Sequence, residues 1–66
     1  KRALYAALGR LPDSQREAVR LVYLEDMSYT DAARVMKKSR KQVDNLVTRA
    51  KRALRGMLSE EGSLFL

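Results

Sequence analysis

The sequence predicts an all-α domain in which short connections join four helices. Apolar residues recur at helical spacings of three and four in four separate segments. Sustained apolar–polar alternation and Asn-Gly or Asp-Gly turns, which indicate strands and hairpins, are absent from the sequence. A chain of 66 residues has room for one small core. We therefore expect one domain over residues 1–58 and a disordered tail over residues 59–66.

The first predicted helix covers residues 2–8, which are mainly strong helix formers. Leu4 and Leu8 lie four residues apart, so they share one face of this helix. Gly9 follows directly, and glycine often ends a helix by taking a left-handed conformation just past its last residue. We expect Gly9 in that position.

The second predicted helix begins near Pro12 and ends at about Leu24. Ser14 and Glu17 have the spacing of a capping box, in which two side chains satisfy free backbone N–H groups. The alternative start places Pro12 at the first helical position, where its fixed φ suits the helix. The carboxylates of Glu25-Asp26 disfavour further helix, because negative charge is unfavourable at a helix C-terminus.

A short third helix, about residues 29–36, precedes a longer fourth helix, about residues 40–58. Ser28 is expected to cap the third helix, and Ser39 with Gln42 forms a capping box for the fourth. The apolar residues of the fourth helix are Val43, Leu46, Val47, Ala50, Leu54 and Met57. Their spacing follows one face of a 3.6-residue period, so we expect that face in the core.

The charge distribution points to a polyanionic partner. Residues 34–55 hold nine basic residues and one acidic residue, a local net charge of +8. The rest of the chain holds five basic and seven acidic residues, a net charge of −2. An ordinary solvated surface mixes both signs, whereas a block of one sign suits nucleic acid.

The composition excludes most catalytic chemistry. The chain has no Cys and no His, which removes thiolate catalysis, imidazole acid–base chemistry and Cys/His zinc sites. Its eight carboxylates are scattered, and none is paired in an apolar context. We expect no enzymatic activity, no metal and no cofactor.

The sequence also argues against a membrane location. No apolar run approaches the ~20 residues that span a bilayer, and no signal-peptide core is present. The fourth helix lacks the aromatic anchors of a helix that lies on a membrane surface. We expect a cytoplasmic protein.

A short capped helix, a tight turn and a longer basic helix form the arrangement of a helix-turn-helix, here over about residues 28–58 without winged elements. In this motif the second helix enters the major groove, where its first residues reach base edges. The predicted base contacts are Arg40, Lys41, Gln42, Asn45 and Thr48. The predicted phosphate contacts are Lys37, Lys38, Arg49 and Arg52.

Several short motifs occur in the order that they have in a known family. They are Leu11-Pro12, Arg16-Glu17, Met27-Ser28-Tyr29, Ala33, Ser39 with Val43, and Arg49-Ala50-Lys51 with Leu54. Through them, residues 11–58 resemble region 4 of bacterial sigma-70-family factors, particularly the extracytoplasmic-function type. The family usually has a glycine followed by an apolar residue in the turn. This chain has Lys37-Lys38 there, which leaves the tightness of the turn open.

The resemblance implies that the domain binds double-stranded DNA at the promoter −35 element while docked on the β-flap of RNA polymerase, and so directs transcription initiation. It also implies that base contacts cluster at Arg40, Lys41 and Asn45, and that an anti-sigma factor is a further partner.

Two other functions remain open. A helix-turn-helix output domain of the response-regulator type normally dimerises through its last helix, but here that helix continues with the basic run RAKRAL. A helical protein-interaction module that binds polymerase or an anti-sigma factor would need an apolar surface. Leu4, Tyr5, Leu8 and Tyr23 are candidates for such a surface, unless they belong to the core.

Overall fold

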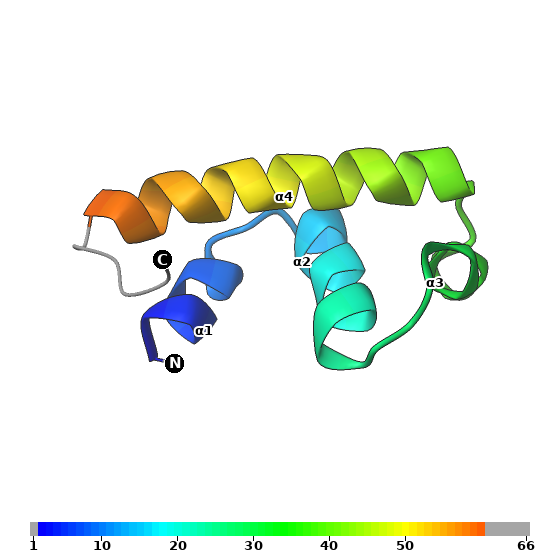
Figure 1. Cartoon of the computed structure of the whole chain (residues 1–66), viewed down its shortest axis with the longest axis horizontal. Helices are drawn as coiled ribbons and strands as arrows, with labels where there is room; N and C mark the ends of the chain where they lie inside the picture. The colour runs from blue at the N-terminus through cyan, green and yellow to red at the C-terminus, as the bar shows by residue number, and fades with distance from the viewer. Residues whose placement is uncertain (1, 61–66) are drawn as a thin grey trace.

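In the computed structural model, residues 2–60 are described, with side chains described through Met57. The helices are α1 (Arg2–Gly9), α2 (Asp13–Val19), α3 (Tyr29–Met36) and α4 (Arg40–Glu60), and a π-helical turn, η1 (Arg20–Leu24), continues α2. No strand occurs within this range, and the predicted all-α fold is confirmed. Figure 1 shows α4 as one long helix, with α1, α2 and α3 arranged in that spatial order beneath it, α3 near its N-terminal end.

Among the side chains described, two apolar clusters form the core, and α4 contributes to both. The first joins α1, α2 and the C-terminal half of α4 through Ala7, Leu8, Leu11, Val19, Ala50 and Leu54. The second joins α2, η1, α3 and the N-terminal half of α4 through Ala18, Leu21, Val22, Ala32, Ala33, Val43 and Val47. The predicted apolar face of α4 is confirmed, although Leu46 and Met57 are only partly buried. One buried face thus fixes how α4 presents its other side to solvent.

The end of α1 differs from the prediction. Gly9 is the last helical residue, and it does not take a left-handed conformation. The helix closes instead through i→i−3 bonds, from Arg10 N–H to Ala7 C=O at 3.0 Å and from Leu11 N–H to Leu8 C=O at 3.1 Å. This tight turn accompanies the burial of Leu11, which is 3% exposed in the core.

Both predicted starts of α2 are wrong. Pro12 is the N-cap residue rather than the first helical residue, with φ −56° and ψ 150°, and no side chain caps the helix. The carboxylate of Glu17 forms an ion pair with Arg20 at 2.9 Å, so it does not complete a capping box with Ser14. The acidic residue at the helix start is Asp13, which suits the positive end of the helix dipole.

The side chain of Arg16 stabilises the connection between α1 and α2. Its guanidinium donates hydrogen bonds to the carbonyl oxygens of Gly9 at 3.3 Å and Leu11 at 3.1 Å, and it also pairs with Asp13. Free carbonyl groups at the end of α1 and just beyond it thereby gain a partner, as the end of a helix requires.

The second helix ends at Leu24 as predicted, but its last turn is π-helical, which the sequence pattern did not predict. Met27 N–H donates to Leu21 C=O at 3.0 Å, and Asp26 between them is left-handed with φ 58°. Leu21 is buried, whereas Tyr23 and Leu24 are 47% and 49% exposed. The wide turn therefore ends with two large apolar side chains at the surface.

The predicted caps of the last two helices are confirmed. Ser28 Oγ accepts a hydrogen bond from Asp31 N–H at 3.0 Å. Gln42 N–H donates to Ser39 Oγ at 3.0 Å, and Ser39 N–H donates to Gln42 Oε1 at 2.7 Å, which completes the capping box.

The fourth helix is longer than predicted, because it reaches Glu60 rather than residue 58. The remainder of the predicted tail, residues 61–66, lies outside the described residues. Among the helices described, none is both long and apolar enough to cross a membrane.

Candidate nucleic-acid interface

The turn between α3 and α4 is tight although it contains no glycine. Lys37 takes a left-handed conformation with φ 58° and ψ 45°. Lys37 N–H donates to Arg34 C=O at 3.3 Å, and Lys38 N–H donates to Ala33 C=O at 2.9 Å. These two bonds are those of a Schellman motif, which satisfies carbonyls at a helix end. The Lys37-Lys38 pair therefore keeps the compact turn of a helix-turn-helix.

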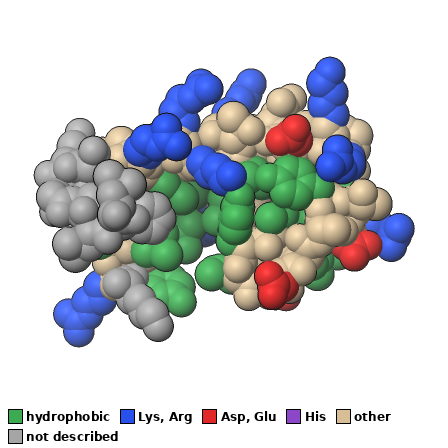
Figure 2. Space-filling model, viewed as in Figure 1, with side chains coloured by type: hydrophobic (Ala, Val, Ile, Leu, Met, Phe, Trp, Pro, Cys, Tyr) green, Lys and Arg blue, Asp and Glu red, His purple; other side chains and the backbone are tan. Residues whose placement is uncertain are grey.

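The nine predicted contact residues are all exposed. Lys41, Asn45, Thr48 and Arg52 follow one another at spacings of four, three and four, so they form one line along α4. This line lies opposite the buried face of the helix. Figure 2 shows Lys and Arg side chains projecting from the edge of the molecule along which α4 runs. We call this exposed side of α4 the basic face.

The start of α4 adds further donors for an anion. The first backbone N–H groups of a helix have no partner within it, and the helix dipole makes this end positive. The Ser39–Gln42 capping box uses the N–H groups of Ser39 and Gln42, which leaves those of Arg40 and Lys41. Lys37 and Lys38 precede this end directly in sequence. The arrangement suits a phosphate group.

Two predicted base-contact residues already have intramolecular contacts. Gln42 Oε1 accepts the capping hydrogen bond, which leaves its amide nitrogen for a base. The guanidinium carbon of Arg40 lies 5.7 Å from the ring centroid of Tyr29, within the range of a cation–π contact.

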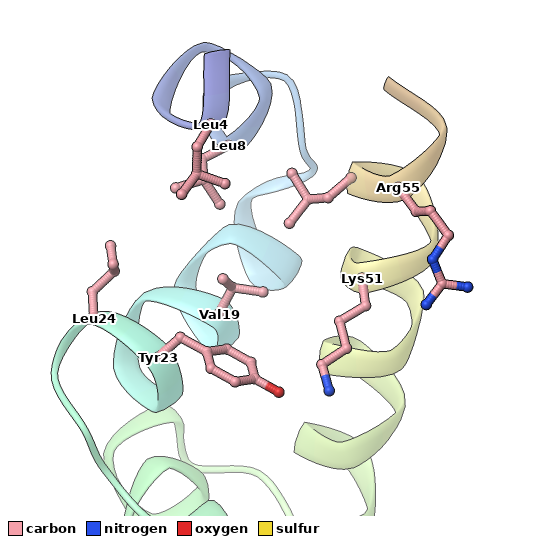
Figure 3. A pocket seen from close by; sticks show the side chains of 8 residues that line it. Leu4, Leu8, Val19, Tyr23, Leu24, Lys51 and Arg55 are labelled. Carbon is pink, nitrogen blue, oxygen red and sulfur yellow. The ribbon is translucent and has the colours of Figure 1, made fainter. Parts of the chain in front are cut away.

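The structure also contains an apolar groove that the sequence did not predict. It has a volume of about 490 Å³ and lies between α1, the end of α2 with η1, and α4. Its lining residues are Leu4, Leu8, Val19, Tyr23, Leu24, Leu54, Lys51 and Arg55. Figure 3 shows these side chains around the groove, with Lys51 and Arg55 on the α4 side.

Lys51 and Arg55, two of the nine basic residues within residues 34–55, therefore line the groove. Lys51 Nζ lies 5.1 Å from the ring centroid of Tyr23, and Figure 3 shows the Tyr23 hydroxyl directed toward Lys51. The interaction with Tyr23 raises the pKa of Lys51 above its ordinary value, so Lys51 stays charged. The groove thus combines an apolar lining with two cations.

The structure brings together three of the four residues that the sequence offered as a candidate partner surface. Leu4 and Tyr23 line the groove, and Tyr23 is exposed. Leu8 lines it as well but is 7% exposed and belongs to the core. Tyr5 is 58% exposed and lies outside the groove. Sequence spacing alone could not find the groove, because three segments far apart in the chain build it.

Comparison with known proteins now decides the family. The family described as Sigma-70, region 4, matches residues 1–54. The chain belongs to the sigma-70 region 4 family. Its match begins at residue 1, so region 4 here includes α1, which lies outside the resemblance seen over residues 11–58.

A relative agrees with this assignment. The ECF RNA polymerase sigma factor SigM of Bacillus subtilis (strain 168) is 32% identical to the region 4 domain over 57 residues. These residues make up 86% of this chain and 35% of SigM, so the chain spans about a third of that relative. No solved structure matches the chain. Region 4 of sigma factors is a DNA-binding regulatory domain and not an enzyme.

Proposed function

We propose that this domain recognises the promoter −35 element as part of a sigma factor that directs RNA polymerase to initiate transcription in the cytoplasm. The observation that carries the proposal is the basic face of α4, which begins at a capped helix end behind a tight turn. Membership of the sigma-70 region 4 family supports it. The same membership counts against a response-regulator output domain.

Different residues of the basic face serve different tasks in this proposal. Asn45 and Thr48 lie on the outermost line of α4, where an amide pairs with adenine and a methyl group contacts thymine. Arg40 and Lys41 at the helix start donate to guanine. The free amide nitrogen of Gln42 donates to an acceptor atom of a base. The phosphate contacts come from Lys37, Lys38, Arg49 and Arg52, which fix register without reading sequence.

The apolar groove supports a second part of the proposal, docking on the β-flap of polymerase. Exposed Tyr23 and Leu24 give a partner an apolar surface, and Lys51 and Arg55 favour carboxylates beside it. An anti-sigma factor that covered the same groove would prevent this docking. None of the nine predicted DNA contacts lines the groove, which supports binding of both partners at the same time.

The affinity of the isolated domain for DNA should be modest. It offers one recognition helix, and non-specific binding of such proteins has dissociation constants of roughly 10⁻⁴ to 10⁻⁶ M. Docking on polymerase raises the effective concentration at a promoter to about millimolar. We therefore expect weak binding alone and selective binding within the holoenzyme.

Fluorescence anisotropy with short duplexes over a range of salt tests the proposal. We expect the affinity to fall steeply with salt and to be highest for one −35-like sequence. A steep salt dependence without sequence preference would remove −35 recognition by the domain alone. No binding at low salt would contradict the DNA-binding function altogether.

A further inference from the structure

The two helices of the helix-turn-helix begin side by side, and one contact joins their first side chains. Tyr29 is the first residue of α3 and Arg40 is the first residue of α4. The guanidinium carbon of Arg40 lies 5.7 Å from the Tyr29 ring centroid. An arginine over an aromatic face within about 6 Å is attracted by the ring.

The ring of Tyr29 is held in place by its surroundings. Tyr29 is partly buried and packs against the second core cluster, together with Met27, Met36 and Leu46. A side chain fixed in this way forms a rigid support for a neighbour that is itself exposed.

Arg40 has little else to hold it. Its side chain is exposed, and it forms no salt bridge with any residue that the structure describes. A free arginine side chain has about 2 kcal/mol of rotamer entropy to lose when it binds. The cation–π contact limits this freedom while it uses none of the five N–H donors of the guanidinium. Those donors remain available for DNA.

We propose that Tyr29 is a positioning residue for DNA binding, because its ring holds the Arg40 guanidinium at the start of α4. The proposal rests on the proposed function, since Arg40 is one of the predicted DNA contacts. The ring carries the effect, whereas the hydroxyl group is dispensable. Tyr29 itself need not touch DNA.

Three variants of the chain separate this role from a purely structural one: Tyr29→Phe keeps the ring, Tyr29→Leu removes it and Arg40→Ala removes the cation. In NMR spectra without DNA, we expect ring-current shifts of the Arg40 side-chain protons in the parent and Phe proteins, and their loss in the Leu protein. We also expect nuclear Overhauser contacts between the Tyr29 ring and the Arg40 side chain in the parent protein, a measurement that does not depend on any variant. Their absence would overturn the proposal even if the Leu protein does not fold.

DNA binding by the same proteins gives the functional readout. Tyr29→Phe should bind a −35-like duplex as the parent does, and Tyr29→Leu about two- to fivefold more weakly, the fold-change that corresponds to a cation–π contact at an exposed site. In the Arg40→Ala background, Tyr29→Leu should cause no further loss. An equal loss in both backgrounds would show a structural role only and contradict the proposal. If no protein binds DNA, the proposed function fails, and the NMR contacts still decide whether Tyr29 holds Arg40.

Discussion

Within residues 2–60, two residues are left-handed although neither is a glycine. They are Asp26, after η1, and Lys37, in the turn before α4. Aspartate tolerates this conformation, because its short polar side chain can bond locally. Lysine has no such compensation, and the left-handed form costs a residue with a Cβ roughly 1–2 kcal/mol. The lysine adds positive charge just before the N-terminal end of α4, where we propose that DNA binds.

The substitution Lys37→Gly should therefore stabilise the fold and weaken DNA binding. We expect a gain of about 1 kcal/mol in the free energy of unfolding, since glycine adopts positive φ without strain. For a domain of this size, this gain raises Tm by roughly 4–8 °C. Thermal unfolding followed by circular dichroism measures it.

The matched control is Lys38→Gly, which removes the same charge from a residue without a positive φ. In both variants, the affinity for DNA should depend less steeply on salt concentration, by the amount that corresponds to about one lost phosphate contact. Only Lys37→Gly should gain stability. Equal Tm values for the two variants would refute the strain at Lys37.

The tyrosine–lysine contacts predict how stability depends on pH. Burial, and then the interaction with Tyr23, raises the pKa of the Tyr29 hydroxyl above 10.0, and Tyr23 raises that of Lys51 above 10.5. The folded state therefore holds these protons more tightly than the unfolded state does. Their stabilisation is complete below about pH 10 and is lost as pH rises further.

Urea denaturation between about pH 8 and pH 11 tests this dependence. The free energy of unfolding should fall above about pH 10, and Tyr29→Phe should reduce the fall, since it removes one of the two groups. If the free energy of unfolding rose over this pH range, the raised pKa values of Tyr29 and Lys51 would be contradicted.

Among the helices, those with local signals were predicted best. The caps at Ser28 and Ser39 fix the starts of α3 and α4, because each depends on groups only three residues apart in the chain. The start of α2 was predicted wrongly, because Glu17 pairs with Arg20 instead. The π-helical turn was not predicted either. It depends on how the end of the helix packs against other segments, which a periodic pattern does not contain.

Leu46 and Leu54 of α4 are buried to different extents, so substitutions at these two residues test the packing of this helix. Leu54 is 6% exposed in the first core cluster, whereas Leu46 is only partly buried. We expect Leu54→Ala to lower the free energy of unfolding by about 2–5 kcal/mol, a large fraction of the stability of a small domain. Leu46→Ala should cost less, because it removes less buried surface. Urea denaturation compares the two, and an equal or larger cost at Leu46 would contradict the burial seen here.

In the molecule as a whole, α4 contributes to two surfaces: it forms the basic face, and it lines the apolar groove through Lys51, Leu54 and Arg55. All nine predicted contact residues are exposed: for the seven on α4 this follows from the helical period, and Lys37 and Lys38 lie in the turn before it. Their roles in binding DNA stay predictions. The groove could not be predicted, since Leu4, Leu24 and Leu54 come together only through the tertiary fold.

Because none of the nine predicted DNA contacts lines the groove, we expect that the two binding activities can be removed independently. Leu24→Glu puts a charge into the groove at a side chain that is 49% exposed, so the domain should remain folded. We expect it to weaken binding to a purified β-flap fragment at least tenfold and to leave DNA binding nearly unchanged. Val35→Glu is the matched control for the β-flap assay, because Val35 is 52% exposed on α3 and lies outside the groove. Equal β-flap binding by both variants would place the docking surface elsewhere.

The most direct test of DNA reading by α4 compares Asn45→Ala with Arg52→Ala on a panel of duplexes that differ at single positions of a −35-like element. Anisotropy titrations at fixed salt give the affinity for each sequence. Asn45→Ala should cost about 1–3 kcal/mol on the preferred sequence and relax one position, whereas Arg52→Ala should weaken all sequences alike. If Asn45→Ala also weakened every sequence equally, base reading by this side chain would be contradicted.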